Sequence, residues 1–444
     1  MDGLKDYIEW LGDVDFSAKP LNETDAVILC LISYYDLAPA ASDQPEEADK
    51  PFYLRDCLEA INAGKLELRI TGGEDGNLGV FKAAANSRRF GELALTDYVD
   101  RLEPENDLQF SAVTFSYGSE WSFIAFRGTD NTIVGWKEDF KIAYTQTEAQ
   151  KLAFAYTADA IFPDTMLEKA QKSRWQSFKQ VFFRRSAQEK PDAERRWYIG
   201  GHSKGGNLAM FSACQLEGPL LDKVERIYNL DGPGFAPEVI DPSLFKRIEP
   251  KTVRIIPEYS IIGRLLESET VETRIIKSSN SAVMQHSIAS WGVDHGHLAK
   301  SDLDEPKDRW LNDTIKQWIS GMSYEQRVIF IDELFGALEA TGAKTLDELT
   351  SMGKGAVDII MEKMKDFSEP TRKVIGDLQS AAVESALVKL LSGTDTVIDT
   401  TKKIIIDSTR KVISGIGTVA AEAAESIMVQ IQLQKMGKGG QNDA

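Results

Sequence analysis

A serine framed by glycines is the residue of this sequence best placed to do chemistry. Residues 201–205 read Gly-His-Ser-Lys-Gly, with Ser203 at the centre. The apolar run before them predicts a short strand, and the run after them predicts a helix. A serine on such a tight strand-to-helix turn holds its hydroxyl above the sheet, where it can act as a nucleophile. We therefore predict that Ser203 is a nucleophile; the alternative is a plain turn between a strand and a helix.

A serine hydroxyl needs a base to take its proton, and imidazole is a suitable base near neutral pH. The sequence contains four histidines. The order serine, acid, histidine places the base late in the chain. We predict that His286 is this base because it follows the last predicted strand, with His295 and His297 as alternatives. His202, beside the serine, is predicted to have a structural role.

The histidine in turn needs a carboxylate that fixes its tautomer and stabilises its charged form. Asp231 follows the strand after the serine helix, and a rigid Gly-Pro-Gly turn comes next. Glu258 follows the next strand and is the alternative acid. An aspartate before a glycine is also a common turn former, which is the structural interpretation of Asp231.

Acyl transfer also requires two N–H groups directed at the developing oxyanion. The residue after the nucleophile, Lys204, is expected to supply one of them. The loop at residues 127–129 is expected to supply the second, from Thr129. Arg127 has a structural alternative, which is an ion pair with a carboxylate such as Asp139.

The elements that must position these residues alternate between strands and helices. Strands are predicted around residues 109–117, 121–126, 197–201, 224–230, 252–256 and 271–276, and residues 26–32 read as a buried helix capped by residues 22–25. This alternation predicts an α/β fold with a largely parallel sheet. Ligands of such sheets bind beyond the carboxyl ends of the strands, which is where the candidate residues fall.

No strand pattern is found beyond about residue 301. Residues 323–326 form a capping box that predicts a helix, a further helix is predicted through Val374, Leu378 and Leu387, and an apolar stripe runs from Ile398 to Ile431. We therefore expect two domains, an α/β domain over residues 1–300 and an all-helical C-terminal extension over 301–444. The stripe is more typical of helix packing than of membrane contact, although contact with a partner protein or a membrane surface is the alternative.

Composition excludes several classes of function. The chain has 444 residues and a formal net charge of -18, which disfavours nucleic acid as a partner. Its three cysteines are widely spaced in apolar surroundings and predict buried, reduced thiols. Residues 294–297 offer three metal ligands in one loop, but without a specific spacing, so we predict no metal and no cofactor. The first residues lack the pattern of a signal peptide, and a cytoplasmic location is expected.

These segments together resemble the class 3, or fungal-type, lipases of the α/β-hydrolase family. The resemblance rests on Phe-Arg-Gly-Thr at residues 126–129, followed by Trp136 and Asp139, and on Gly-His-Ser-Lys-Gly-Gly at 201–206. The chain is most similar to a bacterial lipase-like branch of uncharacterised hydrolases. That likeness also includes the early helical segment and residues 135–140, 231–235 and 260–263, and it spans roughly residues 1–300.

Two positions depart from the lipase pattern. Lys204 stands where the better-known lipases have an apolar residue, which indicates a more polar pocket beside the nucleophile. The acid of the family would fall near Ser260, where no aspartate stands. Asp231 and Glu258 therefore remain the two candidates for the acid.

The resemblance implies a serine hydrolase that cleaves carboxylic esters, with an acyl lipid or a lysolipid as substrate. The residues themselves set neither the chain length nor the head group. The second hypothesis is a catalytically inactive hydrolase fold that serves as a scaffold, whose helical tail binds a partner protein or a membrane surface. The missing acid and the polar Lys204 favour this alternative.

Overall fold

A computed structural model describes most of the chain. The described residues are 2–42, 51–69, 74–130, 132–142, 145–162, 194–236, 238–260, 262–264, 266, 270–280, 285–303, 322–373 and 376. Contacts divide the chain into two compact units. The first comprises residues 1–130 and 134–316, and the second comprises 131–133 and 317–444.

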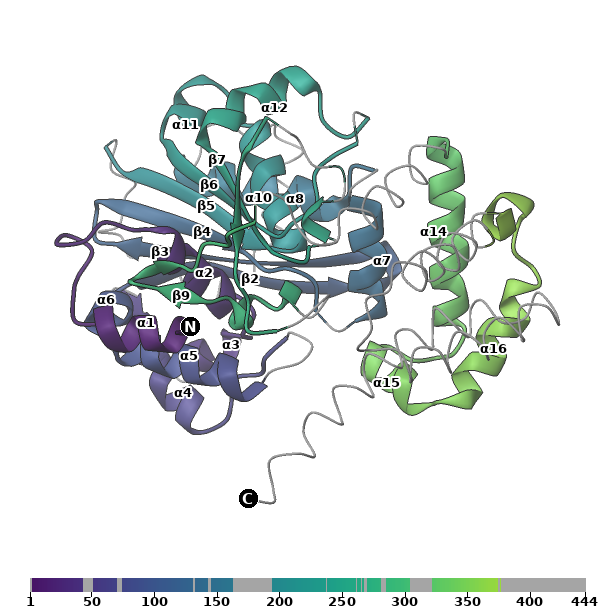
Figure 1. The fold of residues 1–444 in the computed structure, drawn as a ribbon, viewed down its shortest axis with the longest axis horizontal. Coiled ribbons are helices and arrows are strands. Elements are labelled where there is room, and N and C mark those ends of the chain that lie inside the picture. Colours follow the sequence, from purple (N-terminus) through teal and green to yellow (C-terminus); the bar gives the residue numbers. More distant parts are fainter. Residues whose placement is uncertain are drawn as a thin grey trace. The chain divides into compact units, whose positions relative to one another are not determined.

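The first unit is built on an eight-stranded sheet whose strands follow one another in chain order (Figure 1). The pairs from β1 to β4 are antiparallel, and those from β4 to β8 are parallel. The strands are β1 (Phe52–Tyr53), β2 (Ala94–Glu103), β3 (Leu108–Tyr117), β4 (Trp121–Phe126), β5 (Arg196–His202), β6 (Val224–Leu230), β7 (Thr252–Pro257) and β8 (Glu272–Ile276). The predicted α/β class with a largely parallel sheet is confirmed.

The sequence did not reveal β1 and β2. The predicted hairpin around Gly118 is present as β3 and β4, and the later predicted strands occur within a residue or two of their expected bounds. In β2 the alternation of side chains is broken by a bulge between Thr96 and Val99, where Asp97 has a φ of 57°. A bulge inserts a residue and shifts the period, so this segment shows no strand pattern.

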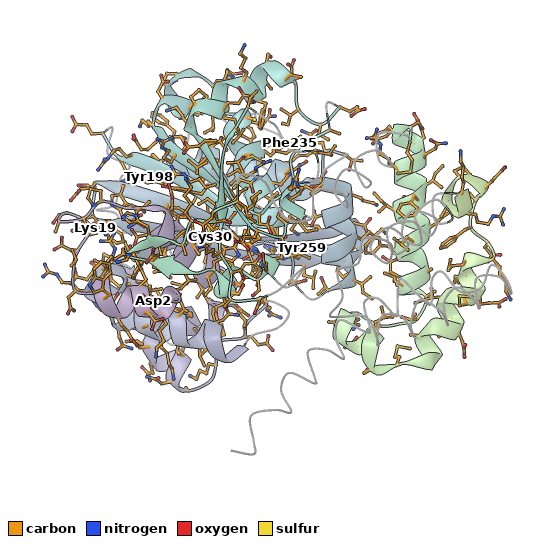
Figure 2. All side chains as sticks on the ribbon, viewed as in Figure 1. Asp2, Lys19, Cys30, Tyr198, Phe235 and Tyr259 are labelled. Atoms are coloured by element: carbon orange, nitrogen blue, oxygen red, sulfur yellow. The ribbon has the colours of Figure 1, made fainter. Side chains whose placement is uncertain are left out.

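Helices cover both faces of the sheet (Figure 1). One face carries α8 (Glu148–Ile161) and α10 (Lys204–Cys214), and the other carries α2 (Glu23–Ile32). Asn22 caps α2 by accepting hydrogen bonds from the N–H groups of Thr24 and Asp25. The predicted buried helix is confirmed, because residues 26–32 are each at most 2% exposed. Figure 2 shows Cys30 of this helix among densely packed side chains.

A buried ion pair joins the N-terminal helices. Arg89 donates to both carboxylate oxygens of Asp25, at 2.9 and 2.6 Å, and both side chains are fully buried. Arg89 also donates to the backbone oxygens of Val14 and Lys19. This side chain therefore connects α6 (Arg88–Gly91) to the loop that precedes α2.

Shorter elements complete the first unit, except that Ile133, which begins the helix at residues 133–142, belongs to the second. They are α1 (Leu4–Leu11), α3 (Ala38–Ser42), η1 (Leu54–Cys57), α4 (Leu58–Asn62), α5 (Glu74–Asn86), α6 (Arg88–Gly91), η2 (Pro104–Asn106), α7 (Ile133–Ile142), α11 (Gly218–Asp222), α12 (Pro242–Ile248), η3 (Glu249–Lys251), η4 (Ile262–Arg264), η6 (Ile288–Ser290), β9 (Val293–Asp294) and β10 (His297–Leu298). The strands β9 and β10 pair with each other as a separate two-stranded sheet. The three cysteines are free and buried.

The described part of the second unit is helical. It contains α14 (Tyr324–Glu339), α15 (Leu346–Ser351) and α16 (Lys354–Met364). The predicted capping box is present, since Ser323 accepts from the N–H of Gln326 and the Gln326 side chain accepts from the N–H of Ser323. The helix predicted through Val374, Leu378 and Leu387 and the stripe from Ile398 to Ile431 lie outside the described residues. Among the helices that are described, none is long and apolar enough to cross a membrane.

Candidate active site

Ser203 occupies a sharp turn between β5 and α10. Its φ of 57° and ψ of -126° are unusual for a residue with a side chain, and such strained conformations concentrate at functional sites. The turn requires glycine on either side: a Cβ atom on Gly201 would lie 2.7 Å from the Cα of Gly205, and one on Gly205 would clash with the backbone of Phe126. The strand, turn and helix around Ser203 have the geometry of a nucleophile elbow.

His286 lies next to Ser203. Its Nε2 atom is 3.0 Å from the Ser203 Oγ atom, although 83 residues separate them in sequence. The two alternative histidines are elsewhere: His297 lies in β10, and His295 pairs with Asp294 with 92% of its side chain exposed. The structure therefore brings His286, rather than His295 or His297, to the serine.

Asp231 completes a chain of hydrogen bonds. It directly follows β6, and its Oδ2 atom lies 2.6 Å from Nδ1 of His286. The carboxylate is fully buried, and its other oxygen accepts a hydrogen bond from the Ser260 hydroxyl. An acceptor at Nδ1 holds the proton there, which leaves Nε2 free to accept from the Ser203 hydroxyl.

Glu258 has a different neighbour. Its carboxylate accepts a hydrogen bond of 2.8 Å from Ser301, and its backbone N–H donates to Ile276. The Nδ1 position of His286 carries a single proton, which is directed at Asp231. Of the two acids suggested by the sequence, the one in contact with the histidine is Asp231.

His202 supports the loop that carries His286. One ring nitrogen of His202 lies 2.7 Å from the His286 backbone oxygen, and the other lies 2.8 Å from the hydroxyl of Tyr34. Because the backbone oxygen can only accept, we assign the proton to Nε2 of His202, so that the Tyr34 hydroxyl donates to Nδ1. Burial, reinforced by the nearby His286, holds the pKa of His202 well below its usual value, which keeps the ring neutral. The predicted structural position of His202 agrees with these contacts.

The loop after β4 lies beside the elbow. Arg127 forms a bidentate ion pair with Asp100 of β2, at 3.0 and 2.7 Å. The side chain of Asp139, the partner suggested by the sequence, lies outside those that the structure describes. A Cβ atom on the next residue, Gly128, would clash with the Tyr34 hydroxyl and would lie 2.5 Å from the His202 backbone oxygen. Thr129 follows directly and is partly buried. The glycine thus lets this loop approach the backbone just before Ser203.

Lys204 begins α10, and the first N–H groups of a helix lack partners within it. Its side chain corrects the expectation of a more polar pocket. The ammonium group is buried and lies 3.0 Å from the carboxylate of Glu138 on α7 and 2.7 Å from the backbone oxygen of Gln109 on β3. The charge of Lys204 is therefore directed into the protein, where Glu138 compensates it.

Three neighbours of the site were not predicted from the sequence. They are Tyr34, Ser260 and Glu138, which contact His202, Asp231 and Lys204 respectively. Ser260 was noted as the place of the missing acid, but its hydroxyl as a partner of Asp231 was not foreseen. No group of three His, Cys, Asp or Glu residues that could hold a metal ion occurs in the part of the chain that the structure describes.

Comparisons with known proteins place the chain in a family. The pattern of the Mbeg1-like family matches residues 84–336, which is more than half of the sequence, so the chain belongs to the Mbeg1-like family. This match begins within the last turn of α5 and runs past residue 300 into α14. Among curated proteins no match is found. Among solved structures, the crystal structure of M37 lipase is similar at 14% identity and a TM-score of 0.29, over 54% of this chain and 68% of that one.

Proposed function

We propose that this protein is a serine hydrolase that cleaves carboxylic esters through an acyl-enzyme intermediate. The observation that carries this proposal is the continuous hydrogen-bonded chain from Ser203 Oγ to His286 at 3.0 Å and from His286 to Asp231 at 2.6 Å. A serine, an imidazole and a buried carboxylate in this order are the parts that nucleophilic acyl transfer requires. The lipase-like pattern of residues 126–129 and 201–206 supports the same reaction class.

The first half of the reaction forms the acyl-enzyme. The Ser203 oxygen attacks the ester carbonyl while Nε2 of His286 takes the hydroxyl proton, and Asp231 stabilises the imidazolium. The backbone N–H groups of Lys204 and Thr129 stabilise the negative charge that develops on the carbonyl oxygen. When the C–O bond of the ester breaks, His286 returns its proton to the leaving alcohol.

The second half releases the acid. A water molecule attacks the acyl carbon while His286 takes one of its protons. Collapse of this intermediate breaks the bond to Ser203, which recovers its proton from His286. The net result is one ester and one water converted to one carboxylic acid and one alcohol, with the enzyme unchanged.

The substrate class follows from the resemblance to class 3 lipases, which implies an acyl lipid or a lysolipid. The contacts of the site do not favour the alternative scaffold hypothesis. No aspartate stands near Ser260 in the sequence, but Asp231 contacts the histidine from the end of β6, and the Lys204 side chain is paired with Glu138. Both features that motivated an inactive scaffold therefore have another explanation.

Covalent labelling tests the nucleophile. A fluorophosphonate probe is expected to label the wild-type protein and to fail with Ser203→Ala, because only an activated serine attacks phosphorus at a useful rate. Ser212→Ala is a matched control, since Ser212 lies on the same helix α10 and its hydroxyl donates to the backbone oxygen of Ala209. Labelling that persists in Ser203→Ala would refute the assignment.

Turnover tests the reaction and the substrate class. Short-chain nitrophenyl esters, a long-chain acyl ester and a lysophospholipid are offered to the full chain, with Ser203→Ala as the blank. We expect Ser203-dependent release of acid, with the lipid substrates preferred. A folded wild-type protein that neither turns over any of these esters nor takes the label would support the scaffold instead.

A further inference from the structure

A charged network that the reaction does not use lies beneath the elbow. The side chain of Lys204 and that of Glu138 are each at most 1% exposed, and their charged atoms are 3.0 Å apart. Burying two charges is costly, and an apolar pair of similar size is often at least as stable. Burial raises the pKa of the Glu138 carboxyl, and the attraction of Lys204 opposes that rise. The connections of this pair indicate what it does.

Gln109 joins this pair to the backbone of the sheet. The Lys204 ammonium donates to the backbone oxygen of Gln109 at 2.7 Å and also to its side-chain oxygen. The Gln109 backbone N–H donates to the same Glu138 oxygen that Lys204 contacts, at 3.0 Å. Every member of the network is buried, and each comes from a different element, namely α10, α7 and β3.

The network also reaches the loop after β4. The side-chain amide of Gln109 donates to the backbone oxygen of Gly128 at 3.4 Å. One side of Gln109 thus contacts the residue after Ser203, and the other contacts the residue before Thr129. These are the two backbone segments that, in the proposed reaction, provide the two oxyanion donors.

We infer that Lys204, Glu138 and Gln109 form a tether that fixes the spacing of the two oxyanion donors. The tether rests on the proposed function, and its members are positioning residues because they do not touch the substrate. The Lys204 residue then has two separate tasks: its backbone N–H stabilises the oxyanion, and its side chain holds that N–H in register with the loop at 127–129. An apolar side chain at position 204 would fill the same space without directional bonds to Gln109.

One double variant distinguishes a positioning role of these residues from a purely structural role. Lys204→Met alone leaves the Glu138 carboxylate buried and uncompensated, so it is expected to lower both the melting temperature and the rate. Adding Glu138→Gln removes that charge and keeps an acceptor for the Gln109 N–H. Lys204→Met/Glu138→Gln is therefore expected to recover most of the melting temperature but not the rate. Lys141→Met is the control, because Lys141 also lies on α7 and pairs with Asp107 instead.

The decisive measurements are kcat, KM and the rate of fluorophosphonate labelling in the double variant. We expect kcat and the labelling rate to fall by about 10- to 100-fold, somewhat less than the loss of a whole oxyanion donor, with KM changed by less than about twofold. Lys141→Met is expected to match the wild type. A double variant with the wild-type melting temperature and the wild-type kcat would overturn the tether.

Amide hydrogen exchange separates this inference from the proposed function. In the double variant, exchange at residues 126–130 and 203–206 is expected to become faster while the rest of the sheet is unchanged. If the wild-type protein shows neither turnover nor labelling, the proposed function fails. Faster exchange in the two segments of the double variant would then still show that the tether holds them together. Unchanged exchange in both segments would overturn it.

Discussion

Ser260 donates a hydrogen bond to the Asp231 oxygen that faces away from His286. Ser260 stands where the lipase pattern would place the acid, after β7, whereas Asp231 directly follows β6. The carboxylate thus approaches the histidine from the end of the strand beside β7, and Ser260 contributes a hydroxyl to it. Asp231 also has a φ of 53°, which directs this residue out of the strand and toward the histidine.

Removing the Ser260 hydroxyl should weaken the reaction without abolishing it. In Ser260→Ala the buried carboxylate loses a charge-assisted hydrogen bond, so its orientation toward His286 is less well fixed. We expect kcat/KM to fall about tenfold, equivalent to about 1.4 kcal/mol. Ser301→Ala removes a similar bond from Glu258 and is expected to retain wild-type activity. Equal losses of kcat/KM in Ser260→Ala and Ser301→Ala would contradict the role of Ser260 in orienting Asp231.

Substituting each candidate acid by its amide distinguishes Asp231 from Glu258 as the acid of the site. Asp231→Asn is expected to lower kcat by about 1,000- to 10,000-fold, because the amide no longer favours the required tautomer of His286 or stabilises its charged form. Glu258→Gln is expected to keep kcat within about threefold of the wild-type value, because the contact of Glu258 with Ser301 lies outside the hydrogen-bonded chain of the site. Steady-state kinetics on a short-chain ester measures both, and a severe loss in Glu258→Gln would exchange the two roles.

Gly128 should tolerate no side chain. A Cβ atom there would clash with the Tyr34 hydroxyl and would also lie 2.5 Å from the His202 backbone oxygen. We expect Gly128→Ala to lower kcat by about 100-fold, since the loop must move away from the elbow. Adding Tyr34→Phe relieves the first clash but not the second, so it should not restore the rate. Full rescue by Tyr34→Phe would show that the hydroxyl alone sets the spacing.

His202 should make the protein sensitive to acid. Its pKa is held well below the usual value in the folded state, whereas in the unfolded chain it is about 6.5. Below pH 6.5 the unfolded chain therefore binds a proton that the folded protein does not, and stability falls by up to about 1.4 kcal/mol for each pH unit.

This loss is absent above pH 6.5 and grows as the pH falls toward the folded pKa of His202. Denaturant unfolding at several pH values between 7.5 and 5 would measure it. The slope should be shallower in His202→Asn, which cannot take up the proton. Identical slopes in His202→Asn and the wild type would contradict this assignment.

The sequence predicted most of the sheet because β4 to β7 are short, mostly apolar strands with glycine or proline close to at least one end. The strands β6 and β7 lie between charged or proline-containing turns, and their bounds were clear. The strand β2 was missed because its bulge at Thr96–Val99 interrupts the period of two on which the prediction depends. The buried helix α2 was recognised from its cap and its continuous apolar run.

Contacts within the site were predictable to different degrees. Ser203, His286 and Asp231 could be proposed because strand ends of a parallel sheet meet at one edge. The direction of the Lys204 side chain could not be predicted, since it depends on Glu138, which is 66 residues away, and on packing between three elements. Tyr34 could not be predicted either, because nothing in its local sequence indicates contact with His202.

The contact between Tyr34 and His202 also limits how far the protein can be truncated from its N-terminus. Tyr34 and the whole of α2 precede residue 84, where the family pattern begins, yet they cover one face of the sheet and touch the residue before Ser203. A truncated protein that starts at residue 84 would expose the apolar face of β4, β5 and β6 that α2 covers. It would also lose the hydrogen bond from Tyr34 to His202, the residue that contacts the backbone of His286. A stable fragment of the first unit therefore needs residues 2–83 as well as the residues that match the family pattern.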